Sequence, residues 1–416
     1  MKIIFVNRYF YPDISATSQL LSDLAFDLAR GEVRVEVVTS RQEYGDAASR
    51  LAPFELIDGV GVSRVWTSRY GRQHLFGRTV DYLTFYAAAG WCLLRRAGPG
   101  DIVVAKTDPP LISVVAAVVA RLRGATLINW TQDLFPEVAT ALGVKSLKPV
   151  EPILRALRNF SLRSARQNVV LGQLMAQRIE AQGVPQDRIR IIHNWSDETQ
   201  IVPINRNANP LRRDWGLADR FVVGYSGNMG RAHEFGTIID AAELVKDQKN
   251  IRFLFIGGGA QADYIVQEAK RRGLGNVDFK PHQPREQLRY SLGTADLHLI
   301  SLQPALEGLI VPSKFYGIAA TGRPTLYIGD PKGEIPTMIK RAECGHTVRP
   351  GEAVELARYI ENLAEDRPRA VRLGENARRV FEQEFSKTQA LVKWKAVIDS
   401  IACVKSRATL APGKND

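Results

Sequence analysis

Short runs of β-branched and aliphatic residues alternate with amphipathic stretches along nearly the whole chain. In the first half these runs are KIIFV, VRVEVVT, DIVVAK, ATLINWT, NVVLG and RIRIIHN, and in the second half FVVGYSG, IRFLFIGGG, VDFKP, LHLISL, PTLYIG and HTVRP. Several are apolar with little alternation, which is typical of strands covered on both faces. Between them lie helical patterns such as SQLLSDLAFDLAR and FGTIIDAAELVKD. The alternation predicts an α/β fold with parallel sheets.

The alternation restarts near residue 220, which predicts two domains. A chain of 416 residues is longer than a single core usually serves. The polar segment 197–220 has no periodic apolar face and is interpreted as a connection between domains. We therefore expect two Rossmann-like, doubly wound domains facing a cleft, residues 1–200 and 201–385. Residues 386–416 are expected to form a helix that can cross back to the first domain, helical to about Val404, and then a polar tail.

Composition excludes several classes of protein. The cysteines, Cys92, Cys344 and Cys403, are far apart in sequence, so neither a disulfide framework nor a cysteine-based zinc site is indicated. No apolar run reaches the roughly 18–20 residues of a membrane-spanning helix, and the N-terminus indicates a first buried strand rather than a signal peptide. These features favour a reducing cytoplasm.

The net charge of +12 has two interpretations. It suits an anionic partner, such as a nucleotide, a phospholipid surface or a nucleic acid, and it equally suits a basic solvated surface. No nucleic-acid-binding motif accompanies the charge, so we expect no nucleic-acid partner.

Two loops of the second half follow predicted strands and carry basic residues. In the loop 224–235, Gly227 and Gly230 permit a tight turn and a close approach to a ligand, and Arg231 follows near the start of the next predicted helix. Taken separately, the two glycines are also typical of an ordinary strand–helix turn, and Arg231 of a surface arginine.

The second loop is EGLIVPSK, in which Pro312 and Ser313 are good helix-opening residues that place Lys314 in the first helical turn. Exposed N–H groups and the helix dipole favour an anion there, whereas a lysine opposes the dipole unless an anion is present. Arg231 and Lys314, directed from separate loops to one point, predict a diphosphate site.

Over nearly its full length the chain resembles glycosyltransferase family 4, whose members have the GT-B fold. The motifs that carry the resemblance are FYPDISATSQLLSDLAFDLA, DLFPE, IIHNWSD, GYSGNMG, FIGGG and VPSKFYGIAATGRP. The last, with its spacing from GYSGNMG, is the most specific. The chain is similar to the branch that builds bacterial surface polysaccharides such as O-antigen and capsule, including transferases of N-acetylfucosamine.

The resemblance implies an activity. It implies a retaining, hexosyl-type glycosyltransferase that uses a nucleoside diphosphate sugar, most simply a UDP-sugar carrying an N-acetylated deoxyhexose, and a lipid-linked or glycan acceptor. Arg231 and Lys314 would stabilise the charge of the departing diphosphate. No metal and no cofactor are then expected, and the sequence has no Asp-x-Asp pair.

The resemblance also implies residues that bind the donor. Backbone N–H groups of 308–310 would assist the phosphates, Glu307 would contact the sugar, and His282 would lie beside the nucleobase, although a surface histidine is the alternative. The family's usual second glutamate falls on Gly317, so its ribose-binding carboxylate is absent. The full donor set is Gly227, Asn228, Gly230, His282, Glu307, Gly308, Leu309, Ile310, Pro312 and Ser313.

On the acceptor side the resemblance points to two segments of the first half. Asp133, in NWTQDLFPE, stands where many members have a catalytic histidine; it can orient the acceptor, act as a base, or cap the following helix. The loop PDISATS implies acceptor contacts from Asp13 and from three residues that replace the family's glycines, Ser15, Ala16 and Thr17.

Residues 145–166 contain six basic residues and one acidic residue, with Val150, Ile153, Leu154, Leu157 and Phe160 on one helical face. Such a helix can lie on an anionic membrane or pack its apolar face on a core. Because many relatives use a polyprenyl-diphosphate-linked sugar as acceptor, we expect peripheral attachment to the inner face of the plasma membrane, with TVDYLTFYAAAGWCLLRR as a second contact.

Three other functions compete. A sugar-nucleotide epimerase shares the two-domain architecture, and a non-catalytic nucleotide-binding scaffold would explain the missing glutamate. A nicotinamide-dependent oxidoreductase expects G-x-G-x-x-G after the first strand, which FVNRYFYPDIS lacks.

Overall fold

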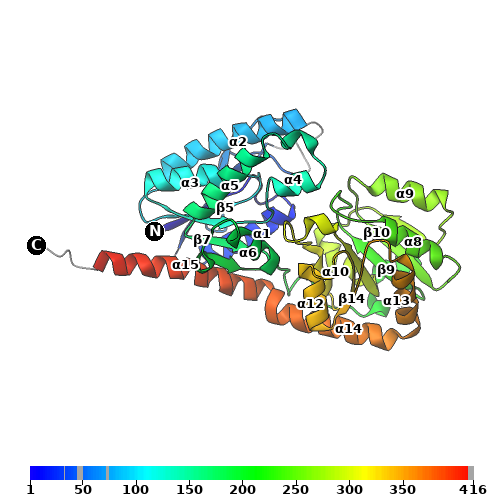
Figure 1. Cartoon of the computed structure of the whole chain (residues 1–416). Coiled ribbons are helices and arrows are strands. Elements are labelled where there is room, and N and C mark those ends of the chain that lie inside the picture. The colour runs from blue at the N-terminus through cyan, green and yellow to red at the C-terminus, as the bar shows by residue number, and fades with distance from the viewer. Residues whose placement is uncertain (32, 45–49, 72–74, 411–416) are drawn as a thin grey trace, which may run out of the picture. The chain divides into compact units, whose positions relative to one another are not determined.

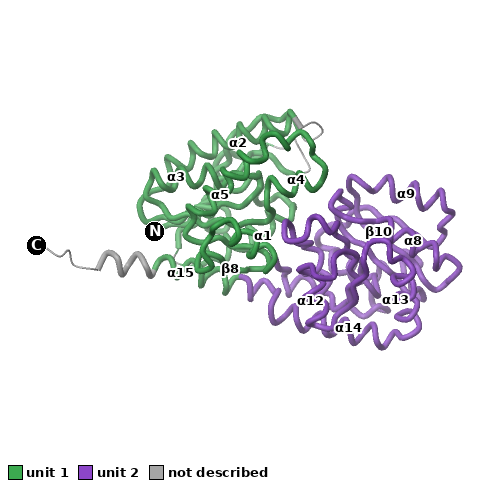
Figure 2. The backbone as a smooth tube through the Cα atoms, viewed as in Figure 1, with its two compact units in different colours: residues 1–193, 391–416 green, residues 194–390 purple. Residues whose placement is uncertain are grey.

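The computed structural model describes residues 1–410 except 32, 45–49 and 72–74, with the backbone alone at 75 and 403–410. The chain forms two compact units: residues 1–193 with 391–416, and residues 194–390 (Figure 2). Unit 1 is therefore built from both ends of the chain, and unit 2 from one continuous segment. The last six residues of the predicted tail, 411–416, lie outside the described residues, as does the side chain of Cys403.

Among the described residues, unit 1 contains an eight-stranded sheet with the order β3-β4-β2-β1-β5-β6-β7-β8. Its strands are β1 (Lys2–Val6), β2 (Arg34–Ser40), β3 (Phe54–Ile57), β4 (Val60–Val65), β5 (Ile102–Lys106), β6 (Thr126–Trp130), β7 (Gln167–Val170) and β8 (Ile189–Ile191). In the parallel centre, Val6 of β1 lies opposite Val38 of β2 and Ala105 of β5.

Helices cover both faces of this sheet. They are α1 (Ala16–Ala29), α2 (Leu75–Arg96), α3 (Ile112–Arg123), α4 (Glu137–Ala141), α5 (Glu151–Ser164), α6 (Gln173–Glu180) and the part of α15 (Lys387–Leu410) that belongs to unit 1. Figure 1 shows α2, α3 and α5 side by side on one face and α1 and α6 on the other. Alternate side chains of the central strands, Ile4, Val103 and Ala105 among them, pack against Phe85 and Ala116 of α2 and α3.

Unit 2 contains a six-stranded sheet of the described residues with the order β11-β10-β9-β12-β13-β14, parallel throughout. The strands are β9 (Phe221–Ser226), β10 (Ile251–Ile256), β11 (Val277–Lys280), β12 (Leu297–Ser301), β13 (Thr325–Ile328) and β14 (Gly345–Val348). The helices are α7 (Pro210–Asp214), α8 (Gly236–Leu244), α9 (Ala262–Arg271), α10 (Leu288–Gly293), α11 (Lys314–Ala320), α12 (Glu334–Ala342), α13 (Ala353–Glu365) and α14 (Arg367–Val380).

Successive side chains of each strand point to opposite faces of this sheet, and both faces are packed against apolar residues. Phe253 and Phe255 of β10 join the core beneath α8, α9 and α13. Their neighbours Leu254 and Ile256 pack on the opposite side with Leu217. Each strand thus contributes apolar side chains to two cores, which is why its sequence shows little polar alternation.

The predicted fold class is confirmed: both units are α/β with Rossmann-like, doubly wound sheets, and all twelve predicted strands are present. One pair departs from the expectation of parallel sheets, because β3 and β4 form an antiparallel hairpin that the sequence analysis missed. Asp58 and Gly59 make its turn, both with positive φ.

The segment 197–220 is also more ordered than predicted. It contains the helix α7, whose N-cap Asn209 accepts from Leu211 N at 3.0 Å and is followed by Pro210. The helix is fixed by Arg212, which is almost fully buried and donates to Asp296 Oδ2 at 3.0 Å. An ion pair in place of an apolar stripe explains why hydrophobic periodicity did not reveal this helix.

The C-terminal helix α15 continues to Leu410, six residues past the predicted end. Within unit 1, Trp394 of this helix is fully buried, and its ring centroid lies 4.6 Å from that of Trp130 at the end of β6.

Candidate functional site

Glycine residues bring three loops together at the carboxyl edge of the unit 2 sheet, where ligands of such sheets bind. Gly227 follows β9 and has a φ of 114°, and Gly257 follows β10 and has a φ of 129°. A Cβ on Gly257 would overlap the Gly227 carbonyl and would lie 3.1 Å from Cε1 of His282, in the loop after β11. The predicted donor residues Gly227 and His282 are thus neighbours across Gly257.

Lys314 reaches from a fourth loop into the same group. Helix α11 begins at Lys314 after N-cap Ser313, as predicted. Its Nζ donates to Asn228 O at 3.1 Å and lies 5.0 Å from the ring centroid of Tyr225. Burial lowers the pKa of Lys314 to about 8. Within the part of the chain that the structure describes, no carboxylate pairs with this ammonium group, so its charge is not neutralised by the protein.

His233 is a further member of the site that sequence reasoning missed. Its Nδ1 lies 2.5 Å from Ser301 O, and because a carbonyl only accepts, Nδ1 carries the proton. Nε2 is then an acceptor, and it lies 3.2 Å from Lys314 Nζ. Burial, with the charge of Lys314, lowers the pKa of His233 to about 4. The sequence places His233 in the same loop as Gly227, which was a usable signal. It was missed because the residues that His233 contacts are 68 and 81 positions away in the sequence.

Arg231 lies in the same loop but is exposed to solvent. It precedes α8, which begins at Gly236, by five residues, so the expectation that it stands near the helix start is wrong. The backbone around it is held firmly: its carbonyl accepts from Gln303 Nε2 at 2.8 Å, and the Gly230 carbonyl accepts from Gln261 Nε2 at 2.7 Å. The convergence of Arg231 and Lys314 on one diphosphate stays a prediction.

Glu307 is buried directly after the short 3-10 turn Pro304–Leu306. Its Oε1 accepts from the Tyr327 hydroxyl at 2.6 Å, and Oε2 accepts from Glu334 N at 3.4 Å, at the start of α12. Burial raises the pKa of Glu307. In this structure the carboxylate therefore joins the loop to β13 and α12.

The loop that follows Glu307 differs from the expectation that its amides are offered to phosphates. The N–H groups of Leu309 and Ile310 both donate to Leu306 O, at 3.0 and 3.3 Å. Gly308 has a φ of 73°, which supplies the tight turn. Pro312 is buried and Ser313 is exposed. At Gly317, in α11, an added Cβ would lie 3.4 Å from Leu292 Cδ1 and 3.7 Å from Ser196 Oγ.

In unit 1 the loop before α1 is organised by Asp13, which is buried. Its Oδ1 accepts from Ser15 N at 2.8 Å and from the Ser15 hydroxyl, and Oδ2 accepts from Tyr44 N. Ser15 is the N-cap of α1, and Ala16, its first residue, is exposed. The carboxylate of Asp13 thus shapes the loop that presents Ala16 and its neighbours.

Thr17 links this loop to the end of β5. Its hydroxyl lies 3.3 Å from Asp108 Oδ2, and its carbonyl accepts from Lys106 Nζ at 2.8 Å. Lys106 is almost fully buried, with Nζ 3.6 Å from the ring centroid of Trp130. Burial lowers the pKa of Lys106, and Asp108 opposes that shift. Lys106 was not predicted, although a lysine at the end of a buried strand is a signal that the sequence contains.

Asp133 lies after β6, close to the hydroxyl of Thr107. The N-cap of α4 is Pro136, so the alternative that Asp133 caps the following helix is wrong. Burial raises the pKa of Asp133 to about 6, although the Thr107 hydroxyl opposes the shift. Its Oδ1 is buried and has no hydrogen-bond partner among the described residues. A carboxyl with this pKa can exchange a proton near neutral pH.

Two features are absent from the described residues. None of their helices has an apolar stretch long enough to cross a bilayer. Nor do they contain a group of three or more histidine, cysteine, aspartate or glutamate side chains arranged to hold a metal ion.

Comparison with known families agrees with this architecture. Residues 17–195 match the model of a glycosyl transferase 4-like domain, and residues 208–380 match that of glycosyl transferases group 1. The chain is therefore a glycosyltransferase of the GT-B fold, and neither model describes an epimerase.

Individual relatives have low sequence identity to this chain but match most of its length. The Pseudomonas aeruginosa protein named "Probable glycosyltransferase WbjE" is 28% identical over 307 residues, 74% of this chain and 76% of its own length. Anabaena HepE, crystallised with UDP and glucose, has a TM-score of 0.72 at 18% identity and covers 96% of this chain and 100% of its own. Sucrose-phosphate synthase of Thermosynechococcus elongatus has a TM-score of 0.78 at 16% identity, with 97% and 100% covered. At these identities the two solved structures establish the fold.

Proposed function

We propose that this glycosyltransferase transfers a hexose-type sugar, an N-acetylated deoxyhexose, from a UDP-sugar with retention of configuration. The observation that carries the proposal is the ammonium group of Lys314, held at the carboxyl edge of the unit 2 sheet without a carboxylate partner among the described residues. A fixed, uncompensated cation at that edge suits a diphosphate. The name of the HepE complex, with UDP and glucose, supports a uridine donor.

The reaction breaks the bond between the anomeric carbon and the diphosphate oxygen, and it forms a bond between the anomeric carbon and the acceptor's hydroxyl oxygen. Positive charge develops on the sugar ring and negative charge on the departing diphosphate. Lys314 is placed to stabilise that negative charge, and its position is set before the reaction by Asn228 O and His233 Nε2. Arg231, exposed in the same loop, adds a second cation once the donor is bound.

The same two cations lead to a proposal about metal dependence. Lys314 and Arg231 supply the positive charge that other transferases obtain from a divalent ion, so transfer proceeds here without a metal or other cofactor. Turnover measured after dialysis against EDTA is expected to equal turnover with added Mg²⁺ or Mn²⁺. A loss of activity that Mn²⁺ restores would contradict this.

The remaining donor contacts follow from the same loops. His282, beside Gly257, lies next to the nucleobase. Glu307 orients the loop that meets the sugar, through its bonds to Tyr327 and Glu334 N. In unit 1, Asp133 accepts the proton of the acceptor hydroxyl, because its raised pKa matches a neutral reaction medium.

We further propose that the acceptor is a polyprenyl-diphosphate-linked sugar of surface-polysaccharide synthesis, reached at the inner face of the plasma membrane. Four of the five apolar residues predicted to share this face are exposed: Ile153 to 62%, and Val150, Leu157 and Phe160 to 42%, 41% and 40%. The fifth, Leu154, is half-buried. Arg158 is instead buried against Glu137, at 2.7 Å.

The neighbouring helices α2 and α3 also carry exposed apolar side chains. Leu122 of α3 is 69% exposed, and Phe76, Leu83 and Trp91 of α2 are also exposed. Figure 1 shows the three helices together on one face of unit 1. Exposed arginines accompany them, including Arg95, whose guanidinium lies over the Trp91 ring. Apolar side chains flanked by arginines suit the surface of an anionic bilayer.

Flotation with anionic liposomes at low salt tests the membrane proposal. The wild type is expected to float, and Ile153→Asp with Leu122→Asp to stay at the bottom of the gradient. Val354→Asp is a matched control, because Val354 is 60% exposed in α13 of unit 2. Equal flotation of all variants, or none by the wild type, contradicts the proposal.

A panel of radiolabelled sugar nucleotides tests the activity itself. Each is incubated with the enzyme and a membrane lipid extract, and the label that enters the lipid phase is counted. A UDP-linked N-acetylated deoxyhexose is expected to give the strongest signal, and digestion with glycosidases of known anomeric specificity reports retention or inversion. Transfer from a different nucleotide class would overturn the donor assignment.

A further inference from the structure

A second charged cavity of unit 2 lies away from the proposed donor site. Its volume is about 750 Å³. It is lined by Phe221, the first residue of β9, by Asp296, directly before β12, and by Arg323, two residues before β13. These positions mark the amino edge of the sheet, whereas Gly227 and Lys314 belong to loops that follow the carboxyl ends.

Five arginines line this cavity together with three acidic residues: Arg206, Arg323, Arg367, Arg378, Arg379, Asp296, Glu375 and Glu382. Two of the three acidic residues are already paired with arginines. Asp296 Oδ2 accepts from the buried Arg212, which does not line the cavity, at 3.0 Å, and from Val222 N at 2.9 Å. Glu382 accepts from Arg378 at 2.6 Å. Four guanidinium groups thus remain against Glu375, an excess of three positive charges.

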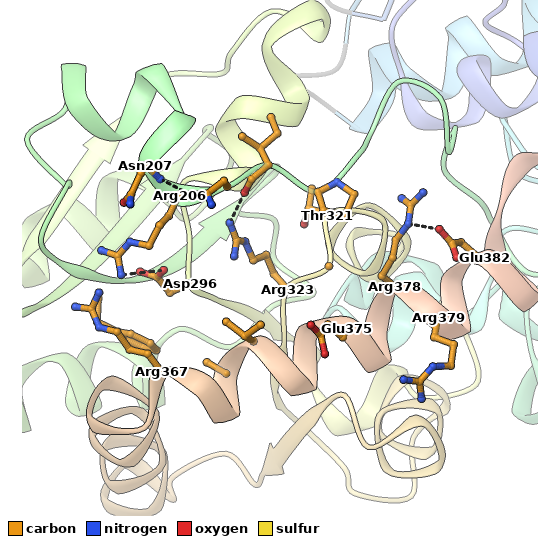
Figure 3. Close-up of a pocket in the computed structure, with 17 residues that line it drawn as sticks. Arg206, Asn207, Asp296, Thr321, Arg323, Arg367, Glu375, Arg378, Arg379 and Glu382 are labelled. Carbon is orange, nitrogen blue, oxygen red and sulfur yellow. Dashed lines mark hydrogen bonds and ion pairs between the residues drawn. The ribbon is translucent and has the colours of Figure 1, made fainter.

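Three of these arginines come from different elements of the fold, and Figure 3 shows Arg206 paired with Asp296 and Arg323 directed to a backbone carbonyl. Arg206 lies in the 3-10 turn Arg206–Ala208, Arg323 precedes β13, and Arg367 begins α14. Backbone carbonyls hold all three in place: Arg206 Nη2 donates to Ala218 O at 2.7 Å, Arg323 Nη2 to Ile204 O at 3.0 Å, and Arg367 Nη2 to Asp219 O at 3.3 Å.

These carbonyl bonds fix the arginines without neutralising them. Arg206 is 3.9 Å from Asp296 Oδ1, a long ion pair with a carboxylate already bound to Arg212. Preorganised guanidinium groups with excess positive charge are features of an anion site.

The geometry points to a phosphate ester as the ligand. We propose that this cavity binds the phosphate group of a phosphorylated small molecule. Three guanidinium groups of separate origin suit a tetrahedral, doubly charged group better than a planar carboxylate. The volume exceeds that of a phosphate ion and lies within the range of small-molecule sites. Ile204, Ala370 and Val371 supply an apolar wall for the organic part.

Isothermal titration calorimetry at low ionic strength tests the site, with glucose 1-phosphate and inorganic phosphate as probes. The enzyme is first saturated with UDP, and Lys314→Ala is titrated in parallel, so that the donor site is blocked in one case and disabled in the other. One binding event is expected in both, with glucose 1-phosphate tighter than inorganic phosphate. Binding lost in Lys314→Ala, or equal affinity for both probes, overturns the proposal.

Variants test whether the measured binding takes place in this cavity. Arg323→Gln and Arg367→Gln are each expected to weaken glucose 1-phosphate at least tenfold. Arg367→Gln keeps the test valid if Arg323→Gln does not fold. Arg372→Gln is the matched control, because Arg372 is exposed on the same helix and faces Asp366 at 4.0 Å, outside the cavity. Unchanged binding in Arg367→Gln, or an equal loss in Arg372→Gln, assigns the heat to another site and refutes the inference.

Discussion

At the scale of single residues, the ammonium group of Lys314 has an unusual environment. It is held by a carbonyl and a neutral imidazole, which fix its position and leave its charge for a ligand. For Lys314→Ala we expect turnover to fall about 10²–10³-fold, the scale of a preorganised charge stabiliser. Steady-state kinetics measure this, with Lys332→Ala, an exposed lysine of unit 2, as the control. Near-normal turnover would remove Lys314 from the mechanism.

The pKa of Lys314 predicts how the rate depends on pH. Its folded pKa is lowered to about 8, and the charged form is the one that stabilises the diphosphate. Activity is therefore expected to be present below pH 8 and to fall as pH rises through that value. Lys314→Arg is expected to lose this alkaline limb, because arginine stays charged. A limb that persists in Lys314→Arg belongs to another group.

Asp133 predicts the acidic limb of the same profile. Its pKa is raised to about 6, and only the ionised carboxylate can accept the acceptor's proton. Activity should fall as pH drops through 6, and Asp133→Asn should reduce turnover by about 10²–10⁴-fold, the scale of general base catalysis. A wild-type rate in Asp133→Asn would contradict the role of base.

His233 predicts an effect on Lys314 rather than on the substrate. A hydrogen bond to the charged form of lysine favours that form. For His233→Phe we expect the alkaline limb of the pH profile to move to lower pH and turnover to fall about tenfold, the scale of one lost hydrogen bond to a charged group. An unchanged limb would show that His233 has only a structural role.

Local chemistry made part of this site predictable. The glycines after β9 and the helix start at Lys314 were found because turn and cap preferences are written in adjacent residues. His233 and Lys106 were missed because their roles arise from Ser301, Lys314, Thr17 and Trp130, which are distant in sequence. The interactions of Leu309 and Ile310 N–H depended on a 3-10 turn that no periodicity reveals.

At the scale of elements, Gly257 and Gly258 are adjacent in the loop after β10, but an added side chain would meet different surroundings at each. For Gly257→Ala we expect a loss of about 2 kcal/mol or more in the free energy of unfolding, because its φ of 129° strains any side chain and its Cβ would overlap Gly227. Gly258→Ala, with nothing within 4 Å, is expected to stay within about 0.5 kcal/mol of wild type. Urea unfolding distinguishes them, and equal stabilities would contradict the packing argument.

Strands were the most predictable elements, because each feeds apolar side chains into two cores and its sequence shows this directly. The hairpin β3–β4 was missed because β3 is half exposed and short. The helix α7 was missed because a buried arginine, not an apolar stripe, attaches it to the sheet.

At the scale of the whole molecule, unit 1 depends on residues from the far end of the chain. Trp394 fills the space against Trp130, and its removal should cost about 3–5 kcal/mol of stability, as for other buried tryptophans. Thermal unfolding of Trp394→Ala measures this, with the exposed Val392→Ala on the same helix as control. Equal midpoints for the two variants would show that α15 is dispensable for unit 1.

This division has a consequence during synthesis. Unit 1 starts with the first residue but includes residues 391–416, whereas unit 2 is a single run from 194 to 390. At about 5–20 residues per second, the ribosome needs roughly 10–40 s to travel from residue 193 to Trp394. Unit 1, which emerges first, is therefore completed last, and until then its sheet lacks the helix that covers Trp130.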